Sequence, residues 1–163
     1  MILEKIQSPA DLRNLPEAEL EIAAGELRQL IISTVAVNGG HLASNCGAVE
    51  LTLALHRVFN TPDEKIFFDV GHQSYAHKIL TGRREDFASL RKIDGISGFP
   101  APEESVFDPA PAGHAGTALS LALGAAAADA GSSDRVIAVV GDGCVGCGMT
   151  LEALNNISGT PGK

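Results

Sequence analysis

Apolar side chains follow two patterns along the chain, and these patterns predict a succession of helices and strands. Residues 16–38 carry apolar side chains at helical spacing, and Gly39-Gly40 ends this helix because glycine readily adopts a left-handed conformation. Apolar runs of strand length lie at residues 65–70 and 136–140, and the second is rich in β-branched side chains. Further helices are expected at residues 47–59, 73–80 and 117–129.

The segments between these elements read as loops. Residues 1–15 look like an irregular lead-in, residues 41–46 like a short loop, and residues 92–112, with several glycines and prolines, like the longest loop. Two strands that are each followed by a helix predict an α/β fold, with a parallel sheet and helices on both of its faces. Because no repeat or linker divides the chain, residues 1–163 are expected to form a single domain.

Composition and charge narrow the class of protein. Hydrophobic residues make up 45% of the 163 residues and aromatic residues only 4%, which fits a soluble domain with an aliphatic core. The net charge of −8 gives no electrostatic basis for binding nucleic acid or an anionic membrane. The longest apolar run, at residues 118–128, is too short to span a bilayer. With no signal-peptide pattern and only three cysteines, we expect a cytoplasmic location.

Gly141-Asp142-Gly143 directly follows the second predicted strand and is the first candidate for chemistry. Such a turn delivers one carboxylate to the carboxyl edge of a sheet, and its glycines let the backbone approach a ligand closely. Asp142 could then bind Mg²⁺, which pairs one or two carboxylates with phosphate oxygens and water. The alternative is a tight strand-to-helix turn that binds nothing.

Two histidines follow glycines at similar places in the predicted fold. Gly71-His72 lies at the carboxyl end of the first strand, and Gly113-His114 begins another expected helix. Ligands of parallel sheets bind beyond the carboxyl ends of the strands. We therefore expect a crevice that holds two or three histidines and an acidic metal ligand.

Three blocks of sequence, in the same order, resemble the 1-deoxy-D-xylulose 5-phosphate synthase family. The resemblance covers about residues 12–159 and favours ligand binding over an empty turn at Asp142. The blocks are Gly-Gly-His-Leu-Ala-Ser-Asn at 39–45 with residues 49–56, Phe-Asp-Val-Gly-His-Gln-Ser-Tyr-Ala-His-Lys-Ile-Leu-Thr-Gly-Arg at 68–83, and Gly-Asp-Gly at 141–143 with residues 148–149 and 152–155.

This resemblance implies a transketolase-type transferase that uses thiamine diphosphate and Mg²⁺. The family condenses pyruvate with glyceraldehyde 3-phosphate and releases CO₂, making a precursor of isoprenoids and thiamine. The fold implied is the diphosphate-binding domain, incomplete here, with the pyrimidine-binding and carboxyl-terminal domains absent. A homodimer, or association with a chain that carries the missing domains, is implied as well.

The resemblance also implies roles for individual residues. Asp142 would bind the metal, while Gly143 and Cys144 would line the diphosphate. His72, as a catalytic residue, and the turn Gly113-His114-Ala115 would contact the cofactor. His41 would be the second catalytic residue and shuttle protons near the substrate, a role that suits imidazole because it titrates near neutral pH.

Several departures and competing interpretations remain open. The family has Gly-His-Ser-Ser where this chain has Ala115-Gly116 after Gly113-His114, so two hydroxyl donors are lost. Cys144 replaces an alanine, and Cys144-Val145-Gly146-Cys147 has the spacing of redox and zinc sites, although two small space-filling residues are the favoured account. His56 and His77 are expected to pack or lie at the surface. Arg83-Arg84 could bind phosphate, but a solvated turn is favoured.

The chain also stops short of parts that the family needs. The asparagine that completes the family's metal site would fall beyond Lys163, and Asn155 and Asn156 are too close to Gly143 to replace it. We therefore expect no synthase activity from this chain alone, and association through unpaired strand edges. The alternatives are a non-catalytic remnant or interaction module of the same ancestry, and the amino-terminal subunit of a transketolase-like enzyme acting on another sugar.

Overall fold

A computed structural model describes residues 1–159 of the chain, and the contacts within it form two compact units. Unit 1 contains Met1–Asn60 and His72–Gly98. Unit 2 contains Thr61–Gly71 and the described residues from Phe99 onward. The last four residues of the predicted 1–163 domain lie outside the described residues.

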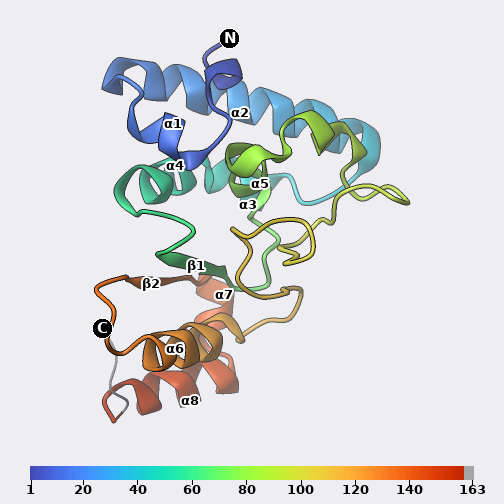
Figure 1. Cartoon of the computed structure of the whole chain (residues 1–163). Coiled ribbons are helices and arrows are strands. Elements are labelled where there is room, and N and C mark those ends of the chain that lie inside the picture. The colour runs from blue at the N-terminus through green and yellow to red at the C-terminus, as the bar shows by residue number, and fades with distance from the viewer. Residues whose placement is uncertain (160–163) are drawn as a thin grey trace. The chain divides into compact units, whose positions relative to one another are not determined.

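Unit 1 is helical (Figure 1). Its longest helix confirms the prediction for residues 16–38: it begins after Pro16 and ends at Asn38, just before Gly39, whose φ is 73°. Its buried side chains, among them Leu27 and Ile31, join the core of the unit. The elements are η1 (Leu3–Lys5), α1 (Pro9–Arg13), α2 (Glu17–Asn38), α3 (Ala43–Gly47), α4 (Val49–Val58), α5 (Tyr75–Lys78), η2 (Ile79–Arg83) and η3 (Glu85–Ser89).

The prediction of an irregular segment at residues 1–15 is wrong, because η1 and α1 lie there. The Asp11 carboxylate accepts the backbone N–H groups of Gln7 and Ser8 at 3.0 and 2.9 Å and so caps the start of α1. Ser8-Pro9 followed by an acidic residue is a helix-start signal that the hydrophobic pattern does not contain. The segment also buries Leu12 in the core of unit 1.

Two further predictions in unit 1 need correction. Residues 41–46 are not simply a loop, because α3 begins at Ala43. The helix expected at residues 73–80 is instead the short α5, which passes into the π-helical turn η2 and leaves helical geometry at Thr81 and at Gly82, whose φ is 93°. The helix expected at residues 47–59 is confirmed as α4, and its predicted face, Val49, Leu53 and His56, is buried.

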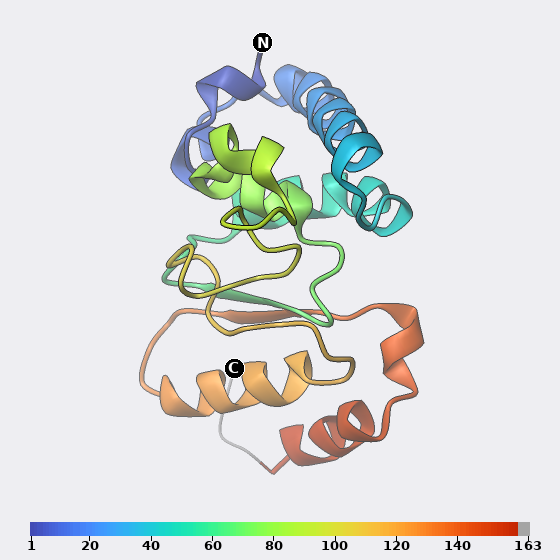
Figure 2. The same cartoon turned by 90° about the vertical axis from the view of Figure 1, so that its right-hand side faces the viewer.

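Unit 2 is built on the parallel pair β1 (Lys65–Phe68) and β2 (Val136–Val139), in register from Lys65 opposite Val136 to Phe68 opposite Val139. Both predicted strands are confirmed, and β1 ends two residues early because Val70 and Gly71 have positive φ angles. The helices of this unit are α6 (Ala118–Ala128), α7 (Asp142–Val145) and α8 (Gly148–Ile157). Figure 2 shows α6 lying along the two strands.

The core of unit 2 explains why α6 lies there. Phe67 of β1 packs with Ala118 and Ala122 of α6, and the small side chains let helix and sheet approach closely. The parallel sheet is thus confirmed, while helices on both of its faces are not. Residues 92–112 are all described and contain no helix or strand, as predicted. No described helix has both the length and the apolar character needed to cross a membrane.

Candidate functional site

His41 and His72, the two predicted catalytic residues, lie together in unit 1. Their ring centroids are 5.4 Å apart, and the rings meet edge to face at 71°. Asn45, fully buried on α3, fixes the backbone on both sides: its Nδ2 donates to the carbonyl of His41 at 2.6 Å and to that of His72 at 2.7 Å. Its Oδ1 accepts the backbone N–H of Tyr75 at 2.8 Å. One amide side chain therefore binds three backbone groups and joins the His41 segment to the His72–Tyr75 segment.

Tyr75 also holds the His41 segment in place. Its buried hydroxyl accepts the backbone N–H of His41 at 3.4 Å. Gly40 has a φ of 134°, and a Cβ atom there would lie 2.7 Å from that hydroxyl, so only glycine fits. Sequence reasoning did not single out Asn45 or Tyr75.

A different observation characterises each of the two histidine side chains. Burial lowers the pKa of His41, and the nearby His72 and Arg91 lower it further. His41 is therefore a neutral imidazole near pH 7, able to accept a proton. The Nδ1 atom of His72 is buried and has no hydrogen-bond partner among the described residues. A buried polar atom of this kind needs a hydrogen-bond partner, which either water or a ligand can supply.

In unit 2, a buried carboxylate joins the end of β1 to the predicted cofactor turn. Asp69 is only 1% exposed, and its Oδ1 accepts the backbone N–H groups of Val70 and Gly116, each at 2.8 Å. The first bond stabilises the positive φ of Val70, and the second fixes the end of the turn at residues 113–116. Sequence reasoning placed Asp69 inside a strand and assigned it no role. Its signal was a charged residue at the end of an apolar run.

Gly113, His114 and Ala115 form an exposed turn that precedes α6. The expectation that Gly113-His114 begins a helix is wrong, because α6 starts only at Ala118. Gly113 has a φ of 131° and open space where a Cβ would lie. The turn therefore presents backbone groups to solvent, as a diphosphate-binding loop would.

Asp142 and Gly143 are exposed and open the short helix α7, directly after β2. Asp142 Oδ1 accepts the backbone N–H of Gly143 at 2.9 Å. The next residue, Cys144, is buried. Burial raises the pKa of the Cys144 thiol, as does the nearby Asp69 carboxylate, while a hydrogen bond with the Gly116 backbone partly offsets both. Asp69, Gly116 and Cys144 thus form one cluster beneath the exposed residues.

Protein ligands alone do not make a metal site in the part of the chain that the structure describes. No group of three or more His, Cys, Asp or Glu side chains is placed to hold an ion there. The zinc interpretation of Cys144 and Cys147 therefore lacks the further ligands that zinc needs. Asp142 could bind Mg²⁺ only with oxygens supplied by a ligand and by water.

The remaining predicted candidates lie inside unit 1. His56 and His77 are buried and stacked, with Nε2 of His56 2.9 Å from Nδ1 of His77. Arg83 is buried and donates to the hydroxyl of Thr81 at 2.7 Å. Arg84 donates to the carbonyl of Leu3 at 2.6 Å. The expected solvated turn at Arg83-Arg84 is therefore wrong, because both guanidinium groups bond within the protein.

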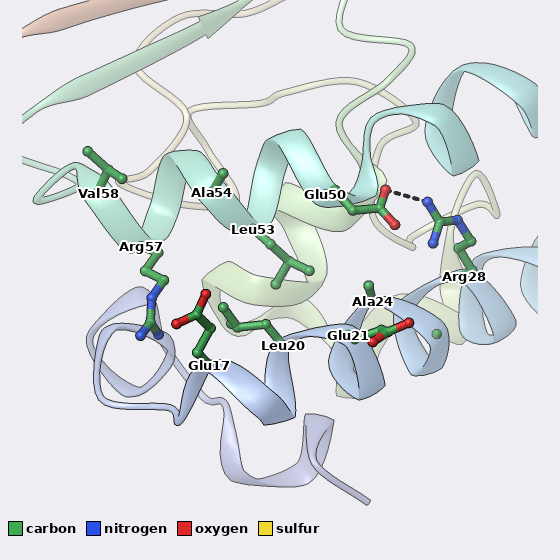
Figure 3. A pocket seen from close by; sticks show the side chains of 11 residues that line it. Glu17, Leu20, Glu21, Ala24, Arg28, Glu50, Leu53, Ala54, Arg57 and Val58 are labelled. Carbon is green, nitrogen blue, oxygen red and sulfur yellow. Dashed lines mark hydrogen bonds and ion pairs between the residues drawn. The ribbon is translucent and has the colours of Figure 1, made fainter.

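Unit 1 also has a groove between α2 and α4, with a volume of about 780 Å³ (Figure 3). Leu20, Ala24 and Leu53 give it an apolar floor, and Arg28 forms an ion pair with Glu50 at its edge. No sequence pattern predicted it. The lining residues are Glu17, Leu20, Glu21, Ala24, Gly25, Arg28, Glu50, Leu53, Ala54, Arg57 and Val58.

Comparison with known proteins identifies the family of the chain. Residues 3–163 match the family described as 1-deoxy-D-xylulose-5-phosphate synthase. The chain is similar to the proteins of that name from Dictyoglomus thermophilum, at 58% identity over 96% of this chain, and from Thiobacillus denitrificans, at 57% over 98%. The protein of that name from Porphyromonas gingivalis is 53% identical over 98% of this chain.

The match covers only part of each relative. The chain spans about a quarter of their length, 26% in all three cases. The chain therefore belongs to the 1-deoxy-D-xylulose-5-phosphate synthase family and corresponds to its amino-terminal part.

Proposed function

We propose that this chain is the diphosphate-binding segment of a thiamine-diphosphate-dependent synthase that condenses pyruvate with glyceraldehyde 3-phosphate and releases CO₂. One observation in unit 2 carries the proposal. Asp142 and Gly143 are exposed directly after β2, and buried Cys144 beside them contacts Gly116, which ends the exposed Gly113 turn. Two segments that the family uses for one cofactor are thus joined by a buried contact.

The residues present fit the diphosphate of such a cofactor. Gly141 and Gly143 have no neighbouring atom within 4 Å of the position of a Cβ, so a ligand could approach the backbone closely. The Asp142 carboxylate is a hard oxygen ligand of the kind Mg²⁺ prefers, and diphosphate oxygens with water would complete the shell. Backbone N–H groups of the Gly113-His114-Ala115 turn would replace the missing hydroxyls. We expect weaker binding than in family members that carry both serines.

The proposal gives each unit a separate task. Thiamine diphosphate, when bound, supplies an electron sink for decarboxylation. In unit 2, Asp142 holds the metal and Gly143 and Cys144 line the diphosphate. In unit 1, neutral His41 takes up and returns a proton, and the buried Nδ1 of His72 offers a hydrogen bond to the cofactor. Asn45 keeps both histidine backbones in place.

We further propose that residues 1–163 form part of one larger domain. The pair β1–β2 would belong to a wider parallel sheet with helices on both faces. The site would be completed by pyrimidine-binding and carboxyl-terminal parts of the kind that the family carries. These parts would lie on the same chain or on a partner chain. A cytoplasmic homodimer is the expected assembly. Residues 1–163 alone would bind the cofactor weakly and not turn over substrate.

Calorimetric titration tests this proposal directly. Thiamine diphosphate should bind residues 1–163 weakly with Mg²⁺ present and much more weakly without it, because metal and diphosphate share one shell. Thiamine, which lacks the diphosphate, is the matched control and should not bind in either condition. If thiamine diphosphate bound no better than thiamine, the chain would be a remnant or an interaction module instead.

A further inference from the structure

We propose that Cys144 and Cys147 form a redox-active dithiol that closes to a disulfide and thereby changes the Gly113–Gly116 turn. Both cysteines are free thiols, and the backbone N–H of Cys147 donates to the carbonyl of Cys144 at 3.1 Å. This bond closes a four-residue turn, in which the outer Cα atoms lie within about 7 Å. Disulfides span Cα separations of about 4.4–6.8 Å. The backbone therefore brings the two Cα atoms to a separation that a disulfide can span.

The two cysteines differ in access to an oxidant. Cys147 is half-buried and precedes α8, whereas Cys144 is 9% exposed, inside α7. A small molecule would therefore reach the sulfur of Cys147 first. Cys144, three residues away on the same turn, would then resolve the bond. Neither sulfur is needed as a metal ligand, because the described residues hold no cluster of metal-binding side chains around them.

Formation of the disulfide would affect the Gly113–Gly116 turn through Gly116. A Cβ atom at Gly116 would lie 3.0 Å from Cβ of Cys147, so the two residues are already in tight contact, and Gly116 has a φ of 83°. The N–H of Gly116 is held by the carboxylate of Asp69 at 2.8 Å. A disulfide places its sulfurs about 2.05 Å apart. Because the bond would fix the side-chain torsions of Cys147, we expect the packing of Cys147 against Gly116 to change.

The oxidant is a low-molecular-weight disulfide, and the exchange balances in two steps. The thiolate of Cys147 attacks one sulfur of the disulfide, which forms a mixed disulfide and releases one thiolate. The thiolate of Cys144 then attacks the sulfur of Cys147, which forms the Cys144–Cys147 bond and releases the second thiolate. The protein loses two hydrogen atoms as two electrons pass to the oxidant, which becomes two thiols.

Mass mapping tests the disulfide without any cofactor. The reduced chain is incubated with oxidised glutathione, its remaining thiols are blocked with N-ethylmaleimide, and its peptides are analysed. We expect a Cys144–Cys147 bridge. Cys46, which lies in unit 1 on α3 without a second cysteine in that helix, is the internal control and should not enter a bridge. Cys144→Ser should instead keep glutathione on Cys147, because no resolving thiol remains. Blocked thiols at both positions, stable glutathione adducts on the wild type, or bridges between chains would overturn the proposal.

Hydrogen exchange tests the effect on the turn. Oxidation should speed amide exchange at residues 113–117 by at least about threefold, because the contact between Gly116 and Cys147 loosens. The double variant Cys144→Ser, Cys147→Ser should not respond to oxidised glutathione. Unchanged exchange in a bridged wild-type chain would overturn the coupling. Any effect on thiamine diphosphate affinity rests on the proposed function, and a reduced chain that binds no cofactor would refute that function without touching the disulfide.

Discussion

At the scale of single residues, buried polar side chains hold the candidate site in place. Asn45 joins the His41 and His72 segments in unit 1, and Asp69 joins β1 to the Gly116 turn in unit 2. Neither residue is proposed to touch a ligand, and each instead fixes the backbone of residues assigned to the candidate site. A buried polar group is stable only when its hydrogen bonds are made. Both residues should therefore be sensitive to substitution.

Asn45→Ala should destabilise the chain by about 2–4 kcal/mol, because it removes the hydrogen bonds to the His41 and His72 carbonyls and to the Tyr75 N–H. Ser44→Ala is the matched control: Ser44 makes one 3.1 Å bond to the His72 carbonyl, so its loss should cost only about 1 kcal/mol. Urea unfolding measures both. Equal losses of stability in the two variants would show that Asn45 does not hold the His41 and His72 segments together.

The buried pair His56 and His77 predicts a dependence of stability on pH. Burial, then His77, Arg13 and Arg83, hold the pKa of His56 well below its ordinary value. The unfolded chain therefore binds more protons than the folded chain below pH about 6.5. The stability that neutral His56 provides is complete above that pH and is lost as the pH falls toward the folded pKa.

His56→Gln should flatten this dependence. Between pH about 6.5 and 5.5, the wild type should lose about 1 kcal/mol more stability than the variant, since one proton per pH unit corresponds to about 1.4 kcal/mol. The exposed His114, changed to Gln, serves as control and should keep the wild-type slope. Urea midpoints at the two pH values decide between these outcomes. An equal loss of stability in the wild type and in His56→Gln would contradict the lowered pKa assigned to His56.

At the scale of elements, long periodic segments could be predicted and short ones could not. The pattern of α2 spans several turns, and the apolar runs of β1 and β2 are unambiguous, so their existence followed from sequence. The helices α1 and α3 are too short for a period to show, and capping and tertiary contacts decide them. Similarly, the candidate glycines and histidines stood out by type, whereas Asn45 and Asp69 act through contacts that only the fold creates.

The turn after β1 should tolerate no side chain at Gly71. Its φ is 82°, and a Cβ there would overlap Cδ of Pro100 and lie 2.9 Å from Cβ of Ala112. Gly71→Ala should therefore cost about 2–4 kcal/mol, from strain and from a clash with packed atoms. Gly141→Ala should change stability by less than about 1 kcal/mol, because its φ is −71° and its surroundings are open. Thermal unfolding of both variants provides the comparison.

At the scale of the whole molecule, the chain corresponds to only part of the length of its family members. It matches about a quarter of the length of its relatives, and the described sheet has only two strands, each with one edge that no described strand covers. Such edges and the exposed apolar side chains of α8, Leu151, Leu154 and Ile157, favour association. We expect residues 1–163 to self-associate in sedimentation experiments at high concentration. A monomer that binds no apolar dye would contradict this.

Residues 1–163 should also show no synthase activity alone. We infer from the family resemblance that the cofactor-activating glutamate and the second metal ligand are not among these residues, so cofactor chemistry should not begin. The assay is CO₂ release from pyruvate with thiamine diphosphate, Mg²⁺ and glyceraldehyde 3-phosphate present. Turnover by purified 1–163, above a control without the chain, would refute this prediction.

The role of Asp142 is the central claim, and one calorimetric comparison tests it most directly. Thiamine diphosphate is titrated with Mg²⁺ into the wild type, Asp142→Ala and His41→Ala. Asp142→Ala should abolish the Mg²⁺-dependent binding, because the exposed carboxylate after β2 is the ligand assigned to the metal. His41→Ala should bind nearly as the wild type does, because His41 is assigned to proton transfer. Equal affinity of the wild type and Asp142→Ala would contradict the account.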